Sequence, residues 1–266
     1  MCNGRRALTA LTAIAALGAV ACDDTAGPVQ GVQVAVAFSG TAGAAAAPSA
    51  SGSLLGTRDV TLAGTNGTLV IEELRIIVAE FELERLNAGD CEEEDDACEK
   101  FEAPPAFVNV PLDGGQTVAV TAVVAPDTYD ELEFEIEDLD DDEEDPVEAR
   151  RIEELLVEIR AEFPDWPRDA SMLIVGTFTP TDGEPVPFRV YFEAEVEIEL
   201  DLVPPVTIAE DDSGATFTVT LNPSLWFVRG DGTVMNLAAF DYDATGTLVE
   251  FEFEMENGFT EIEFDD

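Results

Sequence analysis

The stretch Glu193-Ala194-Glu195-Val196-Glu197-Ile198-Glu199-Leu200-Asp201 alternates acidic and small or apolar residues at every position. Successive side chains of a β-strand point to opposite faces of its sheet, so this pattern predicts a strand with one buried face and one face of carboxylates. The same alternation occurs at 80–84, around Phe81 and Leu83, and again at 131–137. We therefore expect sheet faces covered by acidic groups.

Period-two alternation dominates the chain from Leu54 onward and is interrupted by turn residues. Many short strands separated by turns are typical of a sandwich or barrel. We predict an all-β fold, a β-sandwich with Greek-key-like connections. Beyond the stretches above, strands are expected at 32–38, 69–86 with a bend or bulge midway, 106–112, 116–124, 129–138, 171–179, 186–202, 206–221, 225–228, 233–240, 247–256 and 259–264.

One segment has helical rather than strand periodicity. Asp145 is a suitable N-cap and Pro146 suits the first helical position. The apolar residues from Val147 to Phe163 recur on one helical face, and Pro164 ends the pattern. We expect one short amphipathic helix that covers an end or edge of the sandwich.

Two Asn-Gly pairs predict hairpins with two-residue turns. Asn66-Gly67 would set Leu62 opposite Ile71. Asn257-Gly258 would join the last two strands and set acidic residues opposite one another, which predicts a cation-binding face of Glu250, Glu252, Glu254, Glu261 and Glu263.

The N-terminus has the organisation of an export signal. Arg5 and Arg6 precede an apolar run that is short for a membrane span, and Ala19-Val20-Ala21 precedes Cys22. These residues resemble the lipobox of bacterial lipoproteins, in which the cysteine carries the lipid. We expect a signal peptide at 1–21 and a chain exported and anchored to the bacterial cell envelope through Cys22. Residues 22–53 would form a tether with one strand and a low-complexity linker, and 54–266 the body, as one unit or two sub-domains divided near 140–170.

The charge balance limits the partners. The chain has 12 Lys and Arg against 58 Asp and Glu, a net charge of −46 at pH 7. Such a chain offers no basic surface from which nucleic acid would release counterions, so nucleic acid is not an expected partner. Self-repulsion of this size opposes compaction and is relieved by cations. A solvated surface adapted for solubility is the simpler explanation.

The absence of histidine removes the usual general base and metal ligand, and we expect no enzymatic activity. Two cysteines, Cys91 and Cys98, remain after the signal and Cys22 are set aside, and in an exported protein their spacing predicts a disulfide. We expect the protein to require no cofactor.

Calcium prefers six to eight oxygen ligands, and two acidic stretches are candidates. One contains Asp138, Asp140 and Asp142, and the other begins with Asp241 and Asp243. Trp226, in the expected strand 225–228, is a candidate for stacking on a sugar, with core packing as the alternative.

Several strand and turn segments resemble those of an uncharacterised family of bacterial envelope lipoproteins. They are Gly67 to Ile76, Phe107 to Leu112 and Ala125 to Leu132, followed by Gly176-Thr177-Phe178 and Ser224 to Phe227. The resemblance implies a β-sandwich domain of unknown function. Together these patterns predict a lipid-anchored, non-catalytic module that binds or scaffolds at the cell surface and depends on salt or Ca²⁺. A carbohydrate- or polymer-binding module of an export or uptake system is the alternative, and a polysaccharide or a basic protein would be its partner.

Overall fold

The computed structural model describes residues 31–41, 59–87, 100–139, 146–212, 214–251 and 255–265. Their strands form three sheets, which we call A, B and C. Residues Gly31–Asp266 form one compact unit, with no division between sub-domains near 140–170.

Sheet A has the strand order β14-β12-β1-β7. β1 pairs in parallel with β12 and antiparallel with β7, so it is an inner strand of the sheet. The folded body therefore begins at Gly31 and not at residue 54, because the strand expected in the tether belongs to the core. The bounds are β1 Val32–Gly40, β7 Thr117–Val124, β12 Ala215–Leu221 and β14 Phe259–Asp265.

Sheet C has the order β11-β8-β4-β5, with every neighbouring pair antiparallel. Its strands contain the acidic alternations, and their apolar residues point to the interior. The bounds are β4 Glu80–Arg85, β5 Lys100–Ala103, β8 Asp127–Ile136 and β11 Val196–Ile208.

Sheets A and C pack face to face through aromatic rings. Phe38 of β1 lies with its ring centroid 5.4 Å from that of Phe134 of β8, and 6.2 Å from that of Phe81 of β4. Phe259 of β14 contacts Phe134 at 5.1 Å. All four rings are buried, and this packing confirms the predicted all-β sandwich.

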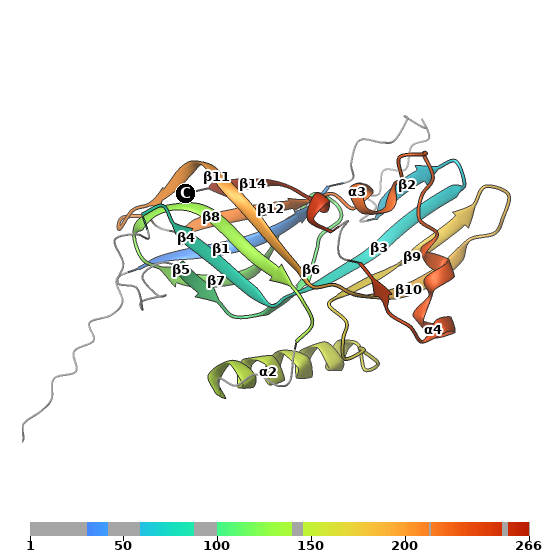
Figure 1. The fold of residues 1–266 in the computed structure, drawn as a ribbon, viewed down its shortest axis with the longest axis horizontal. Coiled ribbons are helices and arrows are strands. Elements are labelled where there is room, and N and C mark those ends of the chain that lie inside the picture. The colour runs from blue at the N-terminus through green and yellow to red at the C-terminus, as the bar shows by residue number, and fades with distance from the viewer. Residues whose placement is uncertain are drawn as a thin grey trace, which may run out of the picture. The chain divides into compact units, whose positions relative to one another are not determined.

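Sheet B is continuous in the chain with sheet C (Figure 1). β3 leads into β4 through Ala79, and β10 leads into β11 through Ala194 and Glu195. The expected strands 69–86 and 186–202 are therefore each two strands in different sheets. The bounds in sheet B are β2 Val60–Gly64, β3 Gly67–Val78, β6 Ala106–Asn109, β9 Met172–Pro180, β10 Val186–Glu193 and β13 Val249–Glu250.

The predicted amphipathic helix is α2, Pro146–Glu162. Its buried residues Leu156 and Ile159 join a small apolar cluster with Trp166 and with Tyr191 of β10. Arg75 of β3 holds the end of the helix, since its Nη2 lies 2.5 Å from Glu162 and its guanidinium stacks on the Phe163 ring. The helix thus packs on the outer face of sheet B, whereas we expected it at an end or edge of the sandwich.

Two expected strands are helical instead. Residues 225–228 lie largely in the one-turn helix α3, Ser224–Phe227, and residues 237–240 form a 3₁₀ turn. Trp226 and Phe227 are consecutive and both buried, which a strand with one solvent face does not permit. The backbone N–H of Ser224 also donates to Asn222 Oδ1 at 3.1 Å and so starts the turn.

The expected C-terminal hairpin does not form. β14 pairs with β12, Asn257 and Gly258 lie in a 3₁₀ turn, and β13 pairs in parallel with β10. The local reason is the packing of Trp226 on this turn, because a Cβ on Gly258 would lie 2.0 Å from the indole Nε1. Asn257-Gly258 is thus fixed by a tertiary contact that the hairpin pattern does not reveal.

The first hairpin forms with a different register. Leu62 pairs with Leu69 rather than Ile71, and the turn is Thr65-Asn66. Asn66 is held outside the strand because its amide donates to Val234 O and accepts from Val234 N, both at 2.9 Å. The shift is two residues, so the same apolar residues still point into the core.

Candidate functional site

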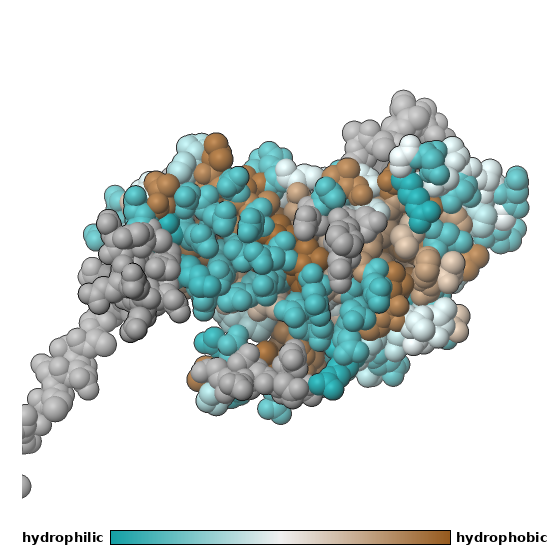
Figure 2. Space-filling view, in the orientation of Figure 1, coloured by the Kyte–Doolittle hydropathy of each residue, from teal (hydrophilic) through white to brown (hydrophobic). Residues whose placement is uncertain are grey.

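The outer face of sheet C carries the densest group of carboxylates in the described residues. Alternation on β4, β8 and β11 sends every second side chain outward, as their sequences predict. Figure 2 shows hydrophilic residues gathered over these strands. We call this surface the carboxylate face, and it consists of Glu80, Glu82, Glu84, Glu102, Glu131, Glu133, Glu135, Glu197, Glu199, Asp201 and Lys100.

The register sets these acids directly opposite one another in rows across the sheet. Glu133 of β8 lies between Glu82 of β4 and Glu199 of β11. The row on one side is Glu80, Glu135 and Glu197, and the row on the other is Glu84, Glu131 and Asp201. Like charges directly opposite one another are destabilising in an antiparallel pair.

Lys100 of β5 is the basic residue on the carboxylate face. It lies opposite Glu84 in the register, and its Nζ is bonded to Glu82 and lies 3.2 Å from Glu102 Oε1. The Glu82 side chain is only 8% exposed, whereas that of Lys100 is 32% exposed. The ion pairs of Lys100 therefore compensate Glu82, the most deeply buried carboxylate of the face, and Glu102, whereas Glu131, Glu133 and Glu135 of β8 form no ion pair with Lys100.

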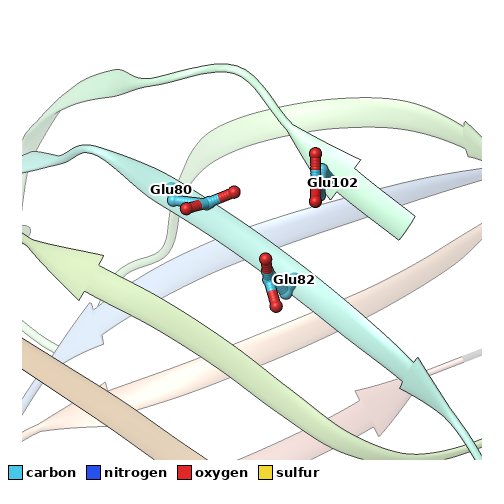
Figure 3. Close-up of side chains that lie close together, drawn as sticks. All are labelled: Glu80, Glu82 and Glu102. Carbon is cyan, nitrogen blue, oxygen red and sulfur yellow. The ribbon is translucent and has the colours of Figure 1, made fainter. Parts of the chain in front are cut away.

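Four groups of three carboxylates are close enough to share a cation. One oxygen from each member lies within 4.8 Å of the others in Glu80/Glu82/Glu102, Glu82/Glu84/Glu133, Glu131/Glu133/Glu199 and Glu133/Glu135/Glu197. Figure 3 shows the first of these, in which two side chains of β4 and one of β5 approach one another. Carboxylate oxygens suit hard cations such as Ca²⁺, although such a site usually needs six or more oxygens.

Burial and mutual repulsion change the acidity of these groups. Desolvation, followed by the charges of Glu82 and Glu102, raises the pKa of Glu80 from 4.5 to about 7. Desolvation, followed by the charge of Glu197, raises the pKa of Glu133 to about 7. The pKa values of Glu131 and Glu135 are also raised, chiefly by burial. The face thus gains negative charge as the pH passes through neutrality.

These raised pKa values predict that stability falls as the pH rises. The native state keeps protons on Glu80 and Glu133 up to about pH 7, whereas the unfolded chain releases them near 4.5. At low ionic strength the melting temperature should therefore decline from about pH 5 to about pH 7.5, and Glu133→Gln should flatten the decline. A melting temperature that increases through this range would contradict the assignment.

The predicted calcium site at Asp241 and Asp243 serves a different purpose. Asp241 Oδ1 accepts the backbone N–H of Arg189 at 2.9 Å, and Asp243 forms an ion pair with the Arg189 guanidinium. Asp243 lies in the one-turn helix α4, Tyr242–Thr245, which follows Asp241 and is ended by Gly246 with φ 65°. These acids hold the chain after sheet B against β10, and a calcium turn at this place stays a prediction.

The described residues of the predicted C-terminal cation face do not lie opposite one another. Glu261 and Glu263 lie on β14 opposite Thr220 and Thr218 of β12, and Glu250 lies on β13 opposite Glu193 of β10. Glu252 and Glu254 lie outside the described residues. The rows of facing acids among the described residues lie instead on β4, β8 and β11, whose alternation the sequence shows but whose pairing it does not.

Trp226 is a core residue and is not available for stacking on a sugar. Its side chain is 4% exposed, and its indole N–H donates to Met255 O at 2.8 Å. It makes edge contacts with Phe227, Phe251 and Phe259. The alternative of core packing is therefore the correct one.

The remaining predicted residues are not brought into this site. Asp138 is half-buried and lies two residues after the end of β8. Cys22, Cys91, Cys98, Asp140 and Asp142 lie outside the described residues, so lipid attachment and the disulfide stay predictions.

Comparisons with known proteins identify no family for the chain. No family model matches it, and no curated protein matches it. Among solved structures, MbnP from Methylosinus trichosporium is similar with a TM-score of 0.35 and 13% identity, over 73% of this chain and 76% of that one. No helix among the described residues combines the length and the apolar character needed to cross a bilayer.

Proposed function

We propose that the protein is a lipid-anchored, non-catalytic module of the bacterial cell envelope that binds cations on its carboxylate face. The observation that carries the proposal is the set of acid rows on β4, β8 and β11, in which Glu133 faces an acid on both sides. Placing like charges opposite one another costs stability, and cations in the surrounding medium would offset that cost.

Diffuse binding of cations is the simpler form of this function. Each three-carboxylate group offers three side chains, and a calcium site needs more oxygens than three monodentate ligands provide. Monovalent salt at high concentration would screen the rows equally well. We therefore favour a screened face over a fixed calcium site, and the carboxylate groups around Glu133 are where an ordered ion would bind.

The alternative of a carbohydrate-binding module has less support. Sugar-binding surfaces use exposed aromatic rings. Among the described residues the exposed aromatic side chain is that of Phe240, which does not belong to a strand of sheet C. The aromatic residues of β4, β5 and β8, such as Phe81 and Phe134, point into the sandwich. A flat acidic face without aromatic rings favours cation binding or scaffolding.

The lipid anchor is supported by the signal-like segment 1–21 and by the resemblance of its end to a lipobox. Two or three acyl chains on Cys22 would hold the body stably at a bilayer, at roughly 0.8 kcal/mol per buried methylene. Cys22→Ser is expected to move the protein from the membrane to the soluble fraction of its host. Unchanged membrane association of this variant would exclude the anchor.

The cation proposal is tested by melting the protein at low ionic strength and then with added NaCl or CaCl₂. Diffuse screening predicts a rise on the order of 5 °C or more between about 20 mM and about 0.5 M NaCl, because several like-charge pairs are relieved at once. Ordered sites predict that calcium gives the same rise, and saturates, at a far lower concentration. If neither cation raises the melting temperature, the proposal fails.

A further inference from the structure

The edge strands of sheets A and C are protected unequally. In the described residues these edges are β14 and β7 of sheet A and β11 and β5 of sheet C. β14 and β11 carry outward acids and β5 carries Lys100 and Glu102, and β11 also contains Pro204 and Pro205. Charges and prolines are the devices by which sheet edges avoid pairing with other chains.

β7 has none of these devices. Its sequence, Thr117-Val118-Ala119-Val120-Thr121-Ala122-Val123-Val124, has no charge and no proline in a chain with a net charge of −46. Val118 is 55% exposed and Val123 is 51% exposed. An exposed apolar strand of this length at an edge is a template for another strand.

The outer face beside this edge is also neutral. The register sets Val118 opposite Ala37 of β1, Thr121 opposite Ala35 and Val123 opposite Gln33. On the next strand, β12, the residues of the same face are threonines, and acids appear only on β14 at the far edge. A second copy that approaches sheet A from the β7 edge therefore faces no carboxylate on β7, β1 or β12.

We propose that β7 pairs antiparallel with β7 of a second copy of this chain, about a two-fold axis at Thr121. Thr121 then faces Thr121 of the second copy, and Val120 faces its Ala122. The pairing of β7 with β1 shifts by one residue between Val120 and Val118, which marks Ala119 as a bulge. If Ala119 stays unpaired in the same way between the two copies, Val118 faces Val123 of the second copy on the outer face.

This register is self-consistent in two ways. Directly opposite residues point to the same face of an antiparallel sheet, and each pair above joins two outward or two inward side chains. The two-fold axis makes every contact occur twice, as a closed dimer requires. It covers both exposed valines and completes the open edge of sheet A.

A second copy is the occupant that the charges favour. A basic partner would be drawn to the carboxylate face and to β14, whereas β7 offers it no acid. Two copies of a chain with a charge of −46 repel one another, so an uncharged edge such as β7 is where they can meet. The pairing should strengthen as salt screens the remaining repulsion.

The test places a charge of either sign at Thr121, on the proposed axis, and measures the dimer by sedimentation velocity. The measurement is made in about 0.5 M NaCl, where the screening length falls to a few ångströms. The purified protein with Cys22→Ser should dimerise in a concentration-dependent manner. Thr121→Glu and Thr121→Lys should each weaken the dimer by at least about tenfold, since like charges then meet at the axis. An equimolar mixture of the two variants should restore it as a heterodimer.

Thr61→Glu is the matched control, because Thr61 is an exposed threonine on β2, an edge strand of sheet B. It makes the same change of charge and should leave the dimer unchanged. A monomer at all concentrations, an equal loss with Thr61→Glu, or a mixture that stays monomeric although both variants melt like the parent would each overturn the proposal.

Discussion

Lys100→Met is expected to lower the free energy of unfolding by about 2 kcal/mol at low ionic strength. Removing one partner of a buried ion pair typically costs about 3–5 kcal/mol, and the partial exposure of Lys100 reduces that cost. The loss arises because the nearly buried carboxylate of Glu82 would be left among Glu80, Glu102 and Glu133 with no cation. Urea unfolding of the parent and the variant measures it.

Two further variants separate this ion pair from the general effect of charge. Adding Glu82→Gln to Lys100→Met should restore most of the lost stability, because no buried charge remains unpaired. Arg150→Met removes the same charge from an exposed helical pair, in which Arg150 Nε lies 4.0 Å from Glu154 Oε1. That variant should change stability by less than about 0.5 kcal/mol, and a loss equal to that of Lys100→Met would refute the assigned role.

Trp226→Ala is expected to destabilise the protein by about 3–5 kcal/mol, the usual cost of removing a large buried aromatic side chain. The indole fills the space between α3 and β14, and its N–H satisfies the carbonyl of Met255. Leu225→Ala is the matched control, since Leu225 is the adjacent residue of α3 and is exposed.

Chemical denaturation of the two variants gives the comparison. Leu225→Ala should stay within about 0.5 kcal/mol of the parent. If Trp226→Ala unfolds at the same denaturant concentration as Leu225→Ala, the indole is not a structural anchor, and the packing around Gly258 and Phe259 would need another explanation.

The features that the sequence predicted correctly are those with a local cause. Alternation identified β4, β8 and β11 of sheet C and their outward acids, and Pro146 identified the start of α2. In each case the side chains themselves determine the element, through the two periodicities of strand and helix.

The features that it missed depend on contacts between distant residues. The alternation at 80–84, 131–137 and 193–201 does not say which strands are neighbours, so the rows through Glu133 were not foreseen. Asn257-Gly258 has the chemistry of a hairpin turn, but the indole of Trp226 needs a glycine there for packing. The turn at Asp241 has the residues of a calcium loop, but Asp241 and Asp243 bind the backbone N–H and the guanidinium of Arg189.

The carboxylate face differs from the other acidic segments in one physical respect. Asp241 and Asp243 are satisfied by the single cation Arg189, whereas the acid rows of sheet C share Lys100. Groups of acids that lack internal compensation must be neutralised by protons or by ions from solution. Raised pKa values and cation binding are therefore two consequences of one arrangement.

Removing charge from β8 and measuring the response of the melting temperature to salt tests whether the carboxylate face binds cations. A variant with Glu131, Glu133 and Glu135 all changed to Gln loses the middle acid of every row. A control with Glu153, Glu158 and Glu184 changed to Gln loses the same charge from exposed positions outside sheet C. The first variant should melt higher than the parent at low salt and gain much less from NaCl, while the control should keep the parental response. An equal response to NaCl in all three proteins would contradict it.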